Sequence, residues 1–175
     1  MILIKIDNVL SAEACKDLDS SIKLNIRPVR DKLVEKCHSA YALSETESLL
    51  LKLTDLVSST VKKQLYPTYS YCRVYHKGAS MRPHIDRWSC EISMSLCVGG
   101  EPWPLWFENY GPMLLQPGSA VIYPGTEITH WREEYPGSGC TQVFLHWVDA
   151  NGPYANYKYD CRDSIAALPN ACNVR

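Results

Sequence analysis

Between Tyr66 and residue 148 the sequence breaks into short β-rich runs separated by glycine and proline. Short strands with turn signals between them are typical of antiparallel double-sheet folds. The predicted strands cover residues 69–76, 84–87, 90–98, 104–108, 113–115, 119–123, 127–132 and 140–148. The turn signals are Gly78, Gly99-Gly100, Gly111-Pro112, Pro117-Gly118, Pro124-Gly125 and Pro136-Gly137. This segment is therefore expected to form a double-sheet jelly roll.

The residues before this segment carry helical patterns. Ser11 is a suitable N-cap, and Glu13 lies near the N-terminus of the helix that Ser11 would open. Residues 44–47 have the form of a capping box, and the apolar residues after them recur at helical spacing, which predicts a helix over residues 45–64. Residues 2–6 read as a strand, and residues 24–43 have no clear pattern. We expect an α+β, mainly β fold, with the N-terminal helices packed on one sheet.

The length of 175 residues suits a single domain over residues 1–175. It would consist of a helical preface at about 1–65, a jelly-roll core at about 66–148 and a C-terminal tail at 149–175 that wraps the surface or forms a lid. The formal net charge is −1, and the chain has no run of lysine or arginine. A nucleic-acid-binding surface normally carries a basic patch, so nucleic acid is disfavoured as a partner.

The eight cysteines include no C-x-x-C pair, so no zinc knuckle or thioredoxin motif is present. The apolar run at residues 1–6 is too short for a signal peptide and lacks a basic leading region. No stretch approaches the roughly 18 apolar residues that a membrane-spanning helix needs. These features predict reduced thiols in a cytoplasmic protein that does not enter a membrane.

The residues that indicate a chemistry are His84 and Asp86, which form a His-x-Asp pair. In a strand, residues two apart point to the same face, so both side chains can face the inside of the jelly roll. His130 ends a strand–turn–strand run and is a candidate third ligand, with His146 as a competitor that could also be a core or outer-shell histidine. Two histidines and one carboxylate form the facial triad of non-haem Fe(II) oxygenases, which leaves positions open for cosubstrate and O2.

From about Tyr71 to Trp147 the sequence resembles the Fe(II)/2-oxoglutarate-dependent dioxygenases, specifically their prolyl 4-hydroxylase-like branch. The matching segments occur in the order found in that family: residues 75–78 with a tyrosine and a glycine turn, 83–86 with His-x-Asp, 91–96 as the next strand, and 116–123 as the strand before the distal histidine. Residues 10–15 also resemble the N-terminal opening of the family. The resemblance favours His130 over His146 as the third ligand.

The resemblance implies a double-stranded β-helix and an enzyme that hydroxylates a C–H bond with 2-oxoglutarate and O2. Fe(II) would be held by His84, Asp86 and His130 and chelated by 2-oxoglutarate, and ascorbate would serve as an auxiliary reductant. The substrate would be a prolyl or other side chain of a peptide or protein, or a free amino acid. The Arg-x5-Arg pattern of the nucleic-acid demethylase branch is absent, since residues 141–147 include no arginine or lysine.

The sequence departs from the family where an arginine or lysine normally binds the distal carboxylate of 2-oxoglutarate. That position falls at Thr141 or Gln142, and neither is charged. A dianionic cosubstrate in a desolvated pocket needs a cation, and arginine suits a carboxylate. The hypothesis is that Arg132 supplies it, because it lies two residues after His130 and would face the same way, while Tyr75 adds a hydroxyl.

Alternatives remain for this cation and for the substrate-binding residues. Arg132 would otherwise pair with Glu133 or Glu134 at the surface, leaving Arg87 or Arg82 as the anchor. By strand alternation Arg87 is expected to point away from the metal face, where it would meet substrate or Glu91. The candidate substrate-binding residues are Arg87, Trp88, Trp106 and Trp147, with Trp103, Tyr135 and Tyr154 as further walls.

Two other classes of function compete with the 2-oxoglutarate-dependent hydroxylase. A cupin-like metal-dependent enzyme would share the jelly roll but would need no anchor for a cosubstrate carboxylate. A non-catalytic jelly-roll binding module would have no need of three metal ligands, so the complete donor set argues against it.

Overall fold

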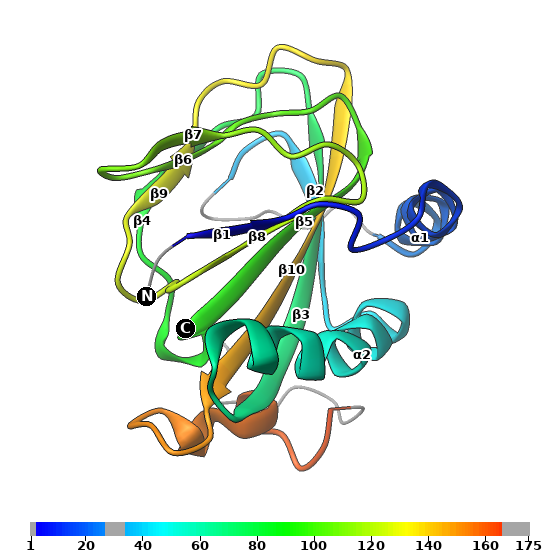
Figure 1. Cartoon of the computed structure of the whole chain (residues 1–175). Coiled ribbons are helices and arrows are strands. Elements are labelled where there is room, and N and C mark those ends of the chain that lie inside the picture. Colours follow the sequence, from blue (N-terminus) through cyan, green and yellow to red (C-terminus); the bar gives the residue numbers. More distant parts are fainter. Residues whose placement is uncertain (1–2, 27–33, 166–175) are drawn as a thin grey trace.

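The computed structural model describes residues 3–26 and 34–165 and consists of two antiparallel sheets with helices on one side (Figure 1). The helical elements are α1 (Ala12–Asn25), α2 (Ser44–Val61), and the 3₁₀ segments η1 (Trp88–Cys90) and η2 (Ala155–Cys161). The strands are β1 (Ile4–Ile6), β2 (Cys37–Tyr41), β3 (Leu65–His76), β4 (Met81–His84), β5 (Ile92–Gly100), β6 (Leu105–Phe107), β7 (Gly111–Met113), β8 (Ala120–Tyr123), β9 (His130–Arg132) and β10 (Gly139–Asp149).

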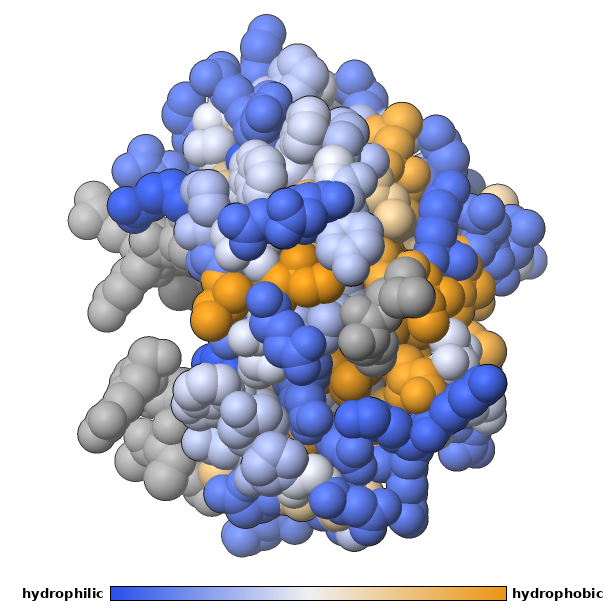
Figure 2. All heavy atoms as spheres, turned by 60° about the vertical axis from the view of Figure 1, so that its left-hand side comes forward, coloured by the Kyte–Doolittle hydropathy of each residue, from blue (hydrophilic) through white to orange (hydrophobic). Residues whose placement is uncertain are grey.

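The major sheet has six strands in the order β1-β8-β5-β10-β3-β2, and the minor sheet has four in the order β4-β9-β6-β7. Helix α2 packs on β3 and β10, and α1 packs on β5, so both helices cover the major sheet on the side away from the minor sheet (Figure 1). This arrangement confirms the predicted jelly roll with N-terminal helices on one sheet. Figure 2 turns the face on the left of Figure 1 forward and shows an apolar band between hydrophilic regions.

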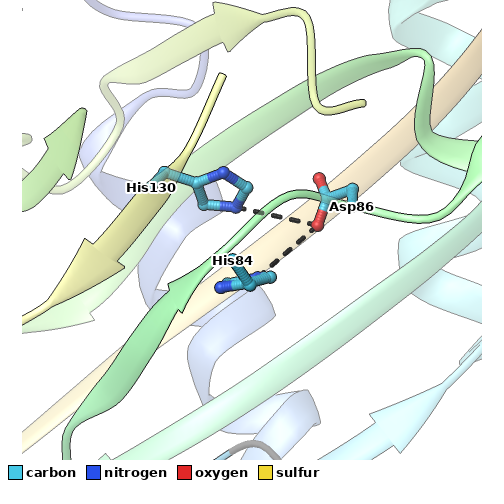
Figure 3. A group of neighbouring side chains, drawn as sticks. All are labelled: His84, Asp86 and His130. Atoms are coloured by element: carbon cyan, nitrogen blue, oxygen red, sulfur yellow. Dashed lines mark ion pairs between the residues drawn. The ribbon is translucent and has the colours of Figure 1, made fainter. Parts of the chain in front are cut away.

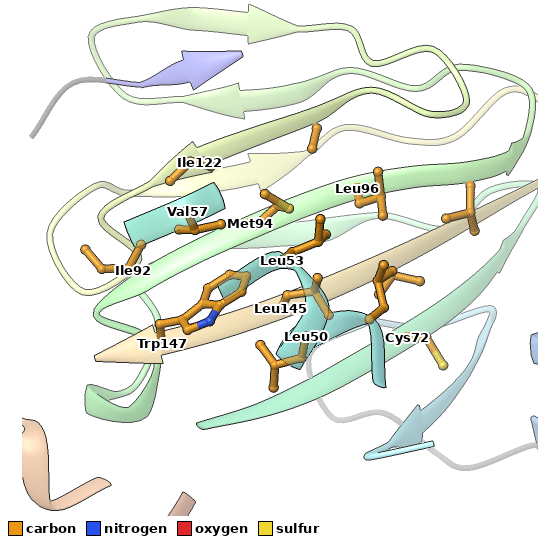
Figure 4. Packing of buried hydrophobic residues seen from close by; sticks show 14 of the residues in the cluster. Leu50, Leu53, Val57, Cys72, Ile92, Met94, Leu96, Ile122, Leu145 and Trp147 are labelled. Atoms are coloured by element: carbon orange, nitrogen blue, oxygen red, sulfur yellow. The ribbon is translucent and has the colours of Figure 1, made fainter. Parts of the chain in front are cut away.

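Strand β10 is buried on both faces and divides the core in two. Its odd-numbered residues Val143, Leu145 and Trp147 face α2 and belong to the helix-side cluster that also contains Leu50 (Figure 4). The even-numbered residue Phe144 belongs to the second cluster, between the two sheets. The indole N–H of Trp147 donates to Thr54 Oγ1 at 3.0 Å. The prediction that Trp147 binds substrate is therefore wrong, because alternation turns its ring into the helix-side core.

The two predicted helix starts have different outcomes. Ser11 Oγ accepts the backbone N–H of Ala14 at 3.2 Å, which confirms the N-cap of α1. Helix α2 begins at Ser44 without a side-chain cap. The predicted capping box is wrong because Glu47 is buried and accepts hydrogen bonds from the backbone N–H and hydroxyl of Ser70, at 2.7 and 2.8 Å.

The strand predicted over residues 84–87 lies three residues earlier in the chain, at Met81–His84, and has the predicted length of four residues. Strand β4 ends at His84, and its register with β9 shifts between Met81 and His84, a stretch that contains Pro83. Proline lacks the N–H that a sheet ladder needs. The chain therefore leaves the sheet before Asp86, and strand alternation does not determine where the next side chains point.

Seven cysteines lie in the described residues and all are free thiols, whereas Cys172 lies outside them. Within the described ranges, no helix has both the length and the apolar character needed to cross a bilayer.

Candidate metal centre and cavity

Three predicted metal ligands meet between the sheets. His84, the last residue of β4, lies opposite His130, the first residue of β9, and Asp86 follows in the turn after β4. Asp86 Oδ1 lies 3.7 Å from His84 Nε2 and 3.6 Å from His130 Nε2, and one donor atom from each residue lies within 4.8 Å of the others (Figure 3). With metal–ligand distances of about 2.1 Å, donors at right angles lie about 3 Å apart. A small contraction would therefore bring all three donors onto one metal ion.

Each imidazole ring is oriented by a hydrogen bond to the backbone carbonyl oxygen two residues before it in the sequence. His84 Nδ1 donates to the carbonyl oxygen of Arg82 at 2.9 Å, and His130 Nδ1 donates to that of Ile128 at 3.0 Å. A carbonyl oxygen only accepts hydrogen bonds, so the proton of each neutral ring lies on Nδ1. Each Nε2 lone pair is then available toward Asp86, an arrangement typical of metal-binding histidines.

Asp86 is positioned from two other elements. Its backbone N–H donates to the carbonyl oxygen of Gly125 at 2.8 Å, and Ser93 Oγ donates to its Oδ2 at 3.0 Å. Gly125 is in close contact with this carboxylate, because a Cβ at position 125 would lie 2.5 Å from Asp86 Oδ2 and from Ser93 Oγ. The carboxylate therefore has one oxygen held by the protein and the other turned toward the histidines.

Desolvation sets the protonation states of the three ligands. Burial lowers the pKa of His130 to about 4 and also lowers that of His84. Burial raises the pKa of Asp86 to about 6. Near neutral pH both rings are therefore neutral and the carboxylate is ionised, and these are the forms that bind a metal. Two neutral imidazoles and one carboxylate fit Fe(II) with open coordination positions.

His146 is linked to Asp86 through Ser93, whose Oγ also contacts Asp86 Oδ2, whereas His84 and His130 lie near Asp86 Oδ1. The Nδ1 atom of His146 lies 3.0 Å from Ser93 Oγ, and its ring centroid lies 4.6 Å from that of Tyr69. Asp86, Cys90 and His146 form a second group of potential metal donors within 4.8 Å of one another. Burial raises the pKa of the Cys90 thiol well above its ordinary value, so thiolate binding is costly there. The triad with His130 is the better donor set.

A cavity of about 380 Å³ opens beside the triad, between the two sheets. Its wall is largely aromatic, from Tyr41, Tyr69, Tyr71, Tyr123 and Phe144. Two cations, Arg73 and Arg87, also line it. The volume falls in the range of small-molecule binding sites, about 300–1,000 Å³.

Arg73 is a site residue that was not predicted from the sequence. It lies on β3 directly opposite Gln142 of β10, the position where the resemblance places a cation. Its guanidinium lies 5.0 Å from the ring centroid of Tyr71 and 5.5 Å from that of Phe144, and Nη1 donates to Met81 Sδ at 3.8 Å. The available signal was alternation, because residues 71, 73 and 75 share one face of the predicted strand 69–76.

Arg132, the predicted anchor, is 1% exposed and lies behind the residues that line the cavity. Its Nη1 donates to the carbonyl oxygen of Trp103 at 2.6 Å, and its Nη2 donates to Gln142 Oε1 at 3.3 Å. It does not pair at the surface with Glu133 or Glu134, the alternative interpretation of the sequence.

The other predicted cosubstrate residues are also buried. Tyr75 is 0% exposed and packs against Trp103, with ring centroids 4.9 Å apart. Thr141 lies on the helix side of β10 by alternation, whereas Gln142 lies between the sheets beside Arg132. Tyr75, Thr141 and Gln142 lie behind the cavity wall and do not line it.

Of the four residues predicted to bind substrate, only Arg87 lines the cavity. This position of Arg87 is contrary to the expectation from alternation, because β4 ends at His84. Trp88 is 49% exposed and stacks on Tyr154 with centroids 5.0 Å apart. Trp106 does not line the cavity and stacks on Trp131 at 6.0 Å.

No protein-family model and no curated protein sequence matches the chain. Solved structures do match its fold. A viral collagen prolyl hydroxylase from Paramecium bursaria Chlorella virus-1, in complex with 2-oxoglutarate, superposes with a TM-score of 0.67 at 13% identity and covers 84% of this chain and 96% of its own. A 2OG-Fe(II) oxygenase family protein from Burkholderia pseudomallei has a TM-score of 0.69 at 11% identity and covers 86% of each chain.

HygX from Streptomyces hygroscopicus, with nickel, 2-oxoglutarate and hygromycin B bound, has a TM-score of 0.70 at 8% identity and covers 85% of this chain and 83% of its own. These identities are low, so the likeness is one of fold. The chain therefore has the jelly-roll fold of the 2-oxoglutarate/Fe(II) oxygenases.

Proposed function

We propose that the protein is an Fe(II)/2-oxoglutarate-dependent oxygenase that hydroxylates a C–H bond. The observation that carries this proposal is the convergence of His84, Asp86 and His130 at the wall of a cavity in a fold that solved oxygenases share. Iron bound there, with 2-oxoglutarate and O2, would supply the oxidant for hydroxylation, while 2-oxoglutarate is converted to succinate and CO2.

The residues of the chain have distinct parts in this proposal. His84, Asp86 and His130 hold the metal, and the carbonyl oxygens behind each ring keep the Nε2 atoms turned toward it. Ser93 fixes the carboxylate of Asp86. The aromatic wall keeps water away from the open side of the metal, which strengthens the electrostatic contacts inside the cavity.

We assign the distal carboxylate of 2-oxoglutarate to Arg73 and not to Arg132. Arg73 lines the cavity, whereas the guanidinium of Arg132 is engaged with Trp103 and Gln142 behind the wall. Arg73 and Gln142 are partners across β3 and β10, so the two positions lie side by side on the sheet, and of the two only Arg73 lines the cavity. The charge expected at position 142 would thus be supplied from the neighbouring strand.

The proposed primary substrate is a small molecule or a short segment of a peptide that fits the cavity beside the metal site. The matching structures include a collagen prolyl hydroxylase and an enzyme with bound hygromycin B. A prolyl or other side chain of a peptide, or a free amino acid, is compatible with a cavity of about 380 Å³. Ascorbate would act as a reductant in solution and is assigned no site on the protein.

The test is anaerobic addition of Fe(II) and 2-oxoglutarate to the purified protein, followed by visible absorption. A metal-to-ligand charge-transfer band is expected, because the two compounds would meet in one coordination sphere. The band should disappear in His84→Ala, Asp86→Ala and His130→Ala and persist in His38→Ala, whose ring packs on His76. A wild-type protein that binds Fe(II) but shows no band would favour a cupin-like enzyme without 2-oxoglutarate. A protein that binds no divalent metal would favour a non-catalytic module.

A further inference from the structure

A second cation, Arg87, lines the cavity and is not used by the proposed cosubstrate site. It follows Asp86 in the turn after β4, and its guanidinium lies 4.4 Å from the ring centroid of Tyr69. Its Nη2 donates to Asp160 Oδ2 at 2.7 Å. In the part of the chain that the structure describes, Asp160 is the one side chain that accepts a hydrogen bond from Arg87.

Asp160 is brought to this position from the C-terminal tail by an unusual backbone. Tyr159, Asp160 and Cys161 have φ angles of 55°, 56° and 60°. Residues other than glycine rarely adopt this region, because the Cβ atom is crowded against the backbone there. Three such residues in succession persist only where the surroundings hold them in place.

The surroundings do hold this part of the tail. Arg162 is buried, and its Nη2 donates to Glu47 Oε2 and to the carbonyl oxygen of Thr68, both at 2.9 Å. Asp160 itself is 0% exposed, and the hydroxyl of Tyr41 donates to its Oδ2 at 2.6 Å. The tail is thus anchored to α2 and β3 so that one buried carboxylate meets Arg87 at the cavity.

Only part of the Arg87 guanidinium is occupied by this contact. The pair is a single-point contact between one nitrogen and one oxygen, and the Arg87 side chain is 36% exposed. A guanidinium has five N–H donors in a planar fork that matches a carboxylate. Asp160 and the Tyr69 ring hold this fork at the cavity wall, and among the described residues no other side chain accepts a hydrogen bond from its remaining donors.

An aromatic stack joins Arg87 to the metal ligands. Tyr41 stacks on Tyr69 with ring centroids 5.1 Å apart, and Tyr69 contacts His146 at 4.6 Å. His146 in turn lies 3.0 Å from Ser93 Oγ, which holds Asp86. A molecule bound to Arg87 would therefore lie along an apolar wall that leads to the metal.

We infer that Arg87 binds a carboxylate of the primary substrate, and that this substrate is a small carboxylic acid of amino-acid size. The inference rests on the proposed function and names its substrate class. Arg73 and Arg87 divide the cavity, so that one cation takes the cosubstrate carboxylate and the other takes the substrate carboxylate. A cavity of about 380 Å³ that must hold both molecules suits an amino acid better than a segment of folded protein.

The experiment uses the full chain with the common free L-amino acids and their carboxamides as paired probes. Binding is measured by calorimetry, without and with anaerobic Fe(II) and 2-oxoglutarate, and by the shift of the visible band. At least one free acid should bind about tenfold or more tightly than its amide, since the amide has no negative charge and only one acceptor oxygen for the guanidinium fork. Arg87→Lys should weaken the acid about tenfold or more by removing the planar fork.

The controls separate this inference from the proposed function. Arg87→Lys should leave the affinity for 2-oxoglutarate within about twofold of wild type. Lys158→Ala removes an exposed cation of the same tail that does not line the cavity, and it should leave the affinity for the acid unchanged. If Arg87→Lys does not fold, Asp160→Asn provides the second variant: it loosens Arg87 and should weaken the acid but not 2-oxoglutarate.

Several results would overturn the inference while the visible band still forms. They are that no free acid binds, that the amide binds as well as its acid, or that both Arg87→Lys and Asp160→Asn bind the acid like wild type. Selective binding of an end-blocked peptide would also overturn it and would point to a peptide substrate. A missing band refutes the proposed function instead, and calorimetry still decides whether Arg87 binds an acid.

Discussion

Removing the Arg73 guanidinium should weaken 2-oxoglutarate binding while the metal site stays intact. Arg73 lines the cavity, whereas the three metal ligands lie on β4, β9 and the turn after β4. A hydrogen bond to a charged group contributes about 1.5–3 kcal/mol. Since about 1.4 kcal/mol corresponds to a tenfold change in affinity, Arg73→Gln should raise the Kd of 2-oxoglutarate about 10- to 150-fold.

The assay is a titration of 2-oxoglutarate into the anaerobic Fe(II) protein, followed by the visible band, with Fe(II) affinity measured separately. The conservative variant is Arg73→Lys, which keeps a positive charge at this position of β3 but removes the planar fork of the guanidinium. It should recover part of the affinity that Arg73→Gln loses, because a cation remains at the cavity wall.

Arg132→Met tests the competing assignment. It removes the hydrogen bonds to Trp103 and Gln142 and should lower the melting temperature, but the Kd of 2-oxoglutarate should change by less than about threefold. The reasoning is refuted if Arg73→Gln binds 2-oxoglutarate like wild type, or if Arg132→Met weakens it as strongly as predicted for Arg73.

Three further outcomes follow from the same geometry. Because burial raises the pKa of Asp86 to about 6 and lowers that of His130 to about 4, Asp86 takes up a proton before His130 does on acidification. Mn(II) affinity, measured by calorimetry, should be constant well above pH 6 and fall at least about tenfold per unit below it, and a constant affinity down to pH 4 would contradict this. Gly125→Ala places a Cβ 2.5 Å from Asp86 Oδ2, so the affinity for metal should fall about 10- to 100-fold. Gly139→Ala is the control: its Cβ would meet nothing closer than 3.8 Å, and this variant should bind metal like wild type. Leu50→Ala truncates a fully buried residue of the helix-side cluster and should cost about 2–5 kcal/mol in denaturant unfolding, with metal affinity below the transition unchanged; a loss of metal affinity would show that the two halves of the core are coupled.

The strands and the cluster of His84, Asp86 and His130 were predictable because most of their signals are local in the sequence. Strand-forming runs bounded by glycine and proline predict the jelly roll. The His-x-Asp pair and His130 are predicted as three donors, and the structure places them together. Strand spacing does not explain the position of Asp86, because Asp86 lies beyond the end of β4 and not on the strand. The backbone N–H of Asp86, which donates to Gly125, and the hydroxyl of Ser93 position it instead.

The cations of the cavity were harder to predict because their placement depends on contacts between distant residues. Alternation put Arg132 on the inner face correctly, but it could not show that Trp103 and Gln142 would engage the guanidinium. Arg73 reaches the cavity from a strand that precedes the His-x-Asp pair. Arg87 turns inward because β4 ends early and because Asp160 approaches from 73 residues further along the chain.

The predictions for Glu47 and Trp147 are also wrong because tertiary contacts decide where these side chains lie. Glu47 satisfies a capping pattern, yet strand β3 and Arg162 of the tail engage its carboxylate. Trp147 is predicted from the sequence to bind substrate, although its odd-numbered position on β10 places it with Leu145 on the helix side. Alternation from His146, which lines the cavity, would have given the correct face for Trp147.

The most direct test of the proposed function is a crystal structure of the protein grown anaerobically with Mn(II) and 2-oxoglutarate. We expect one metal ion held by His84, Asp86 and His130, with the distal carboxylate of 2-oxoglutarate on Arg73. A metal ion held instead by Asp86, Cys90 and His146, or a cavity that contains the metal but no 2-oxoglutarate, would contradict this assignment of the site.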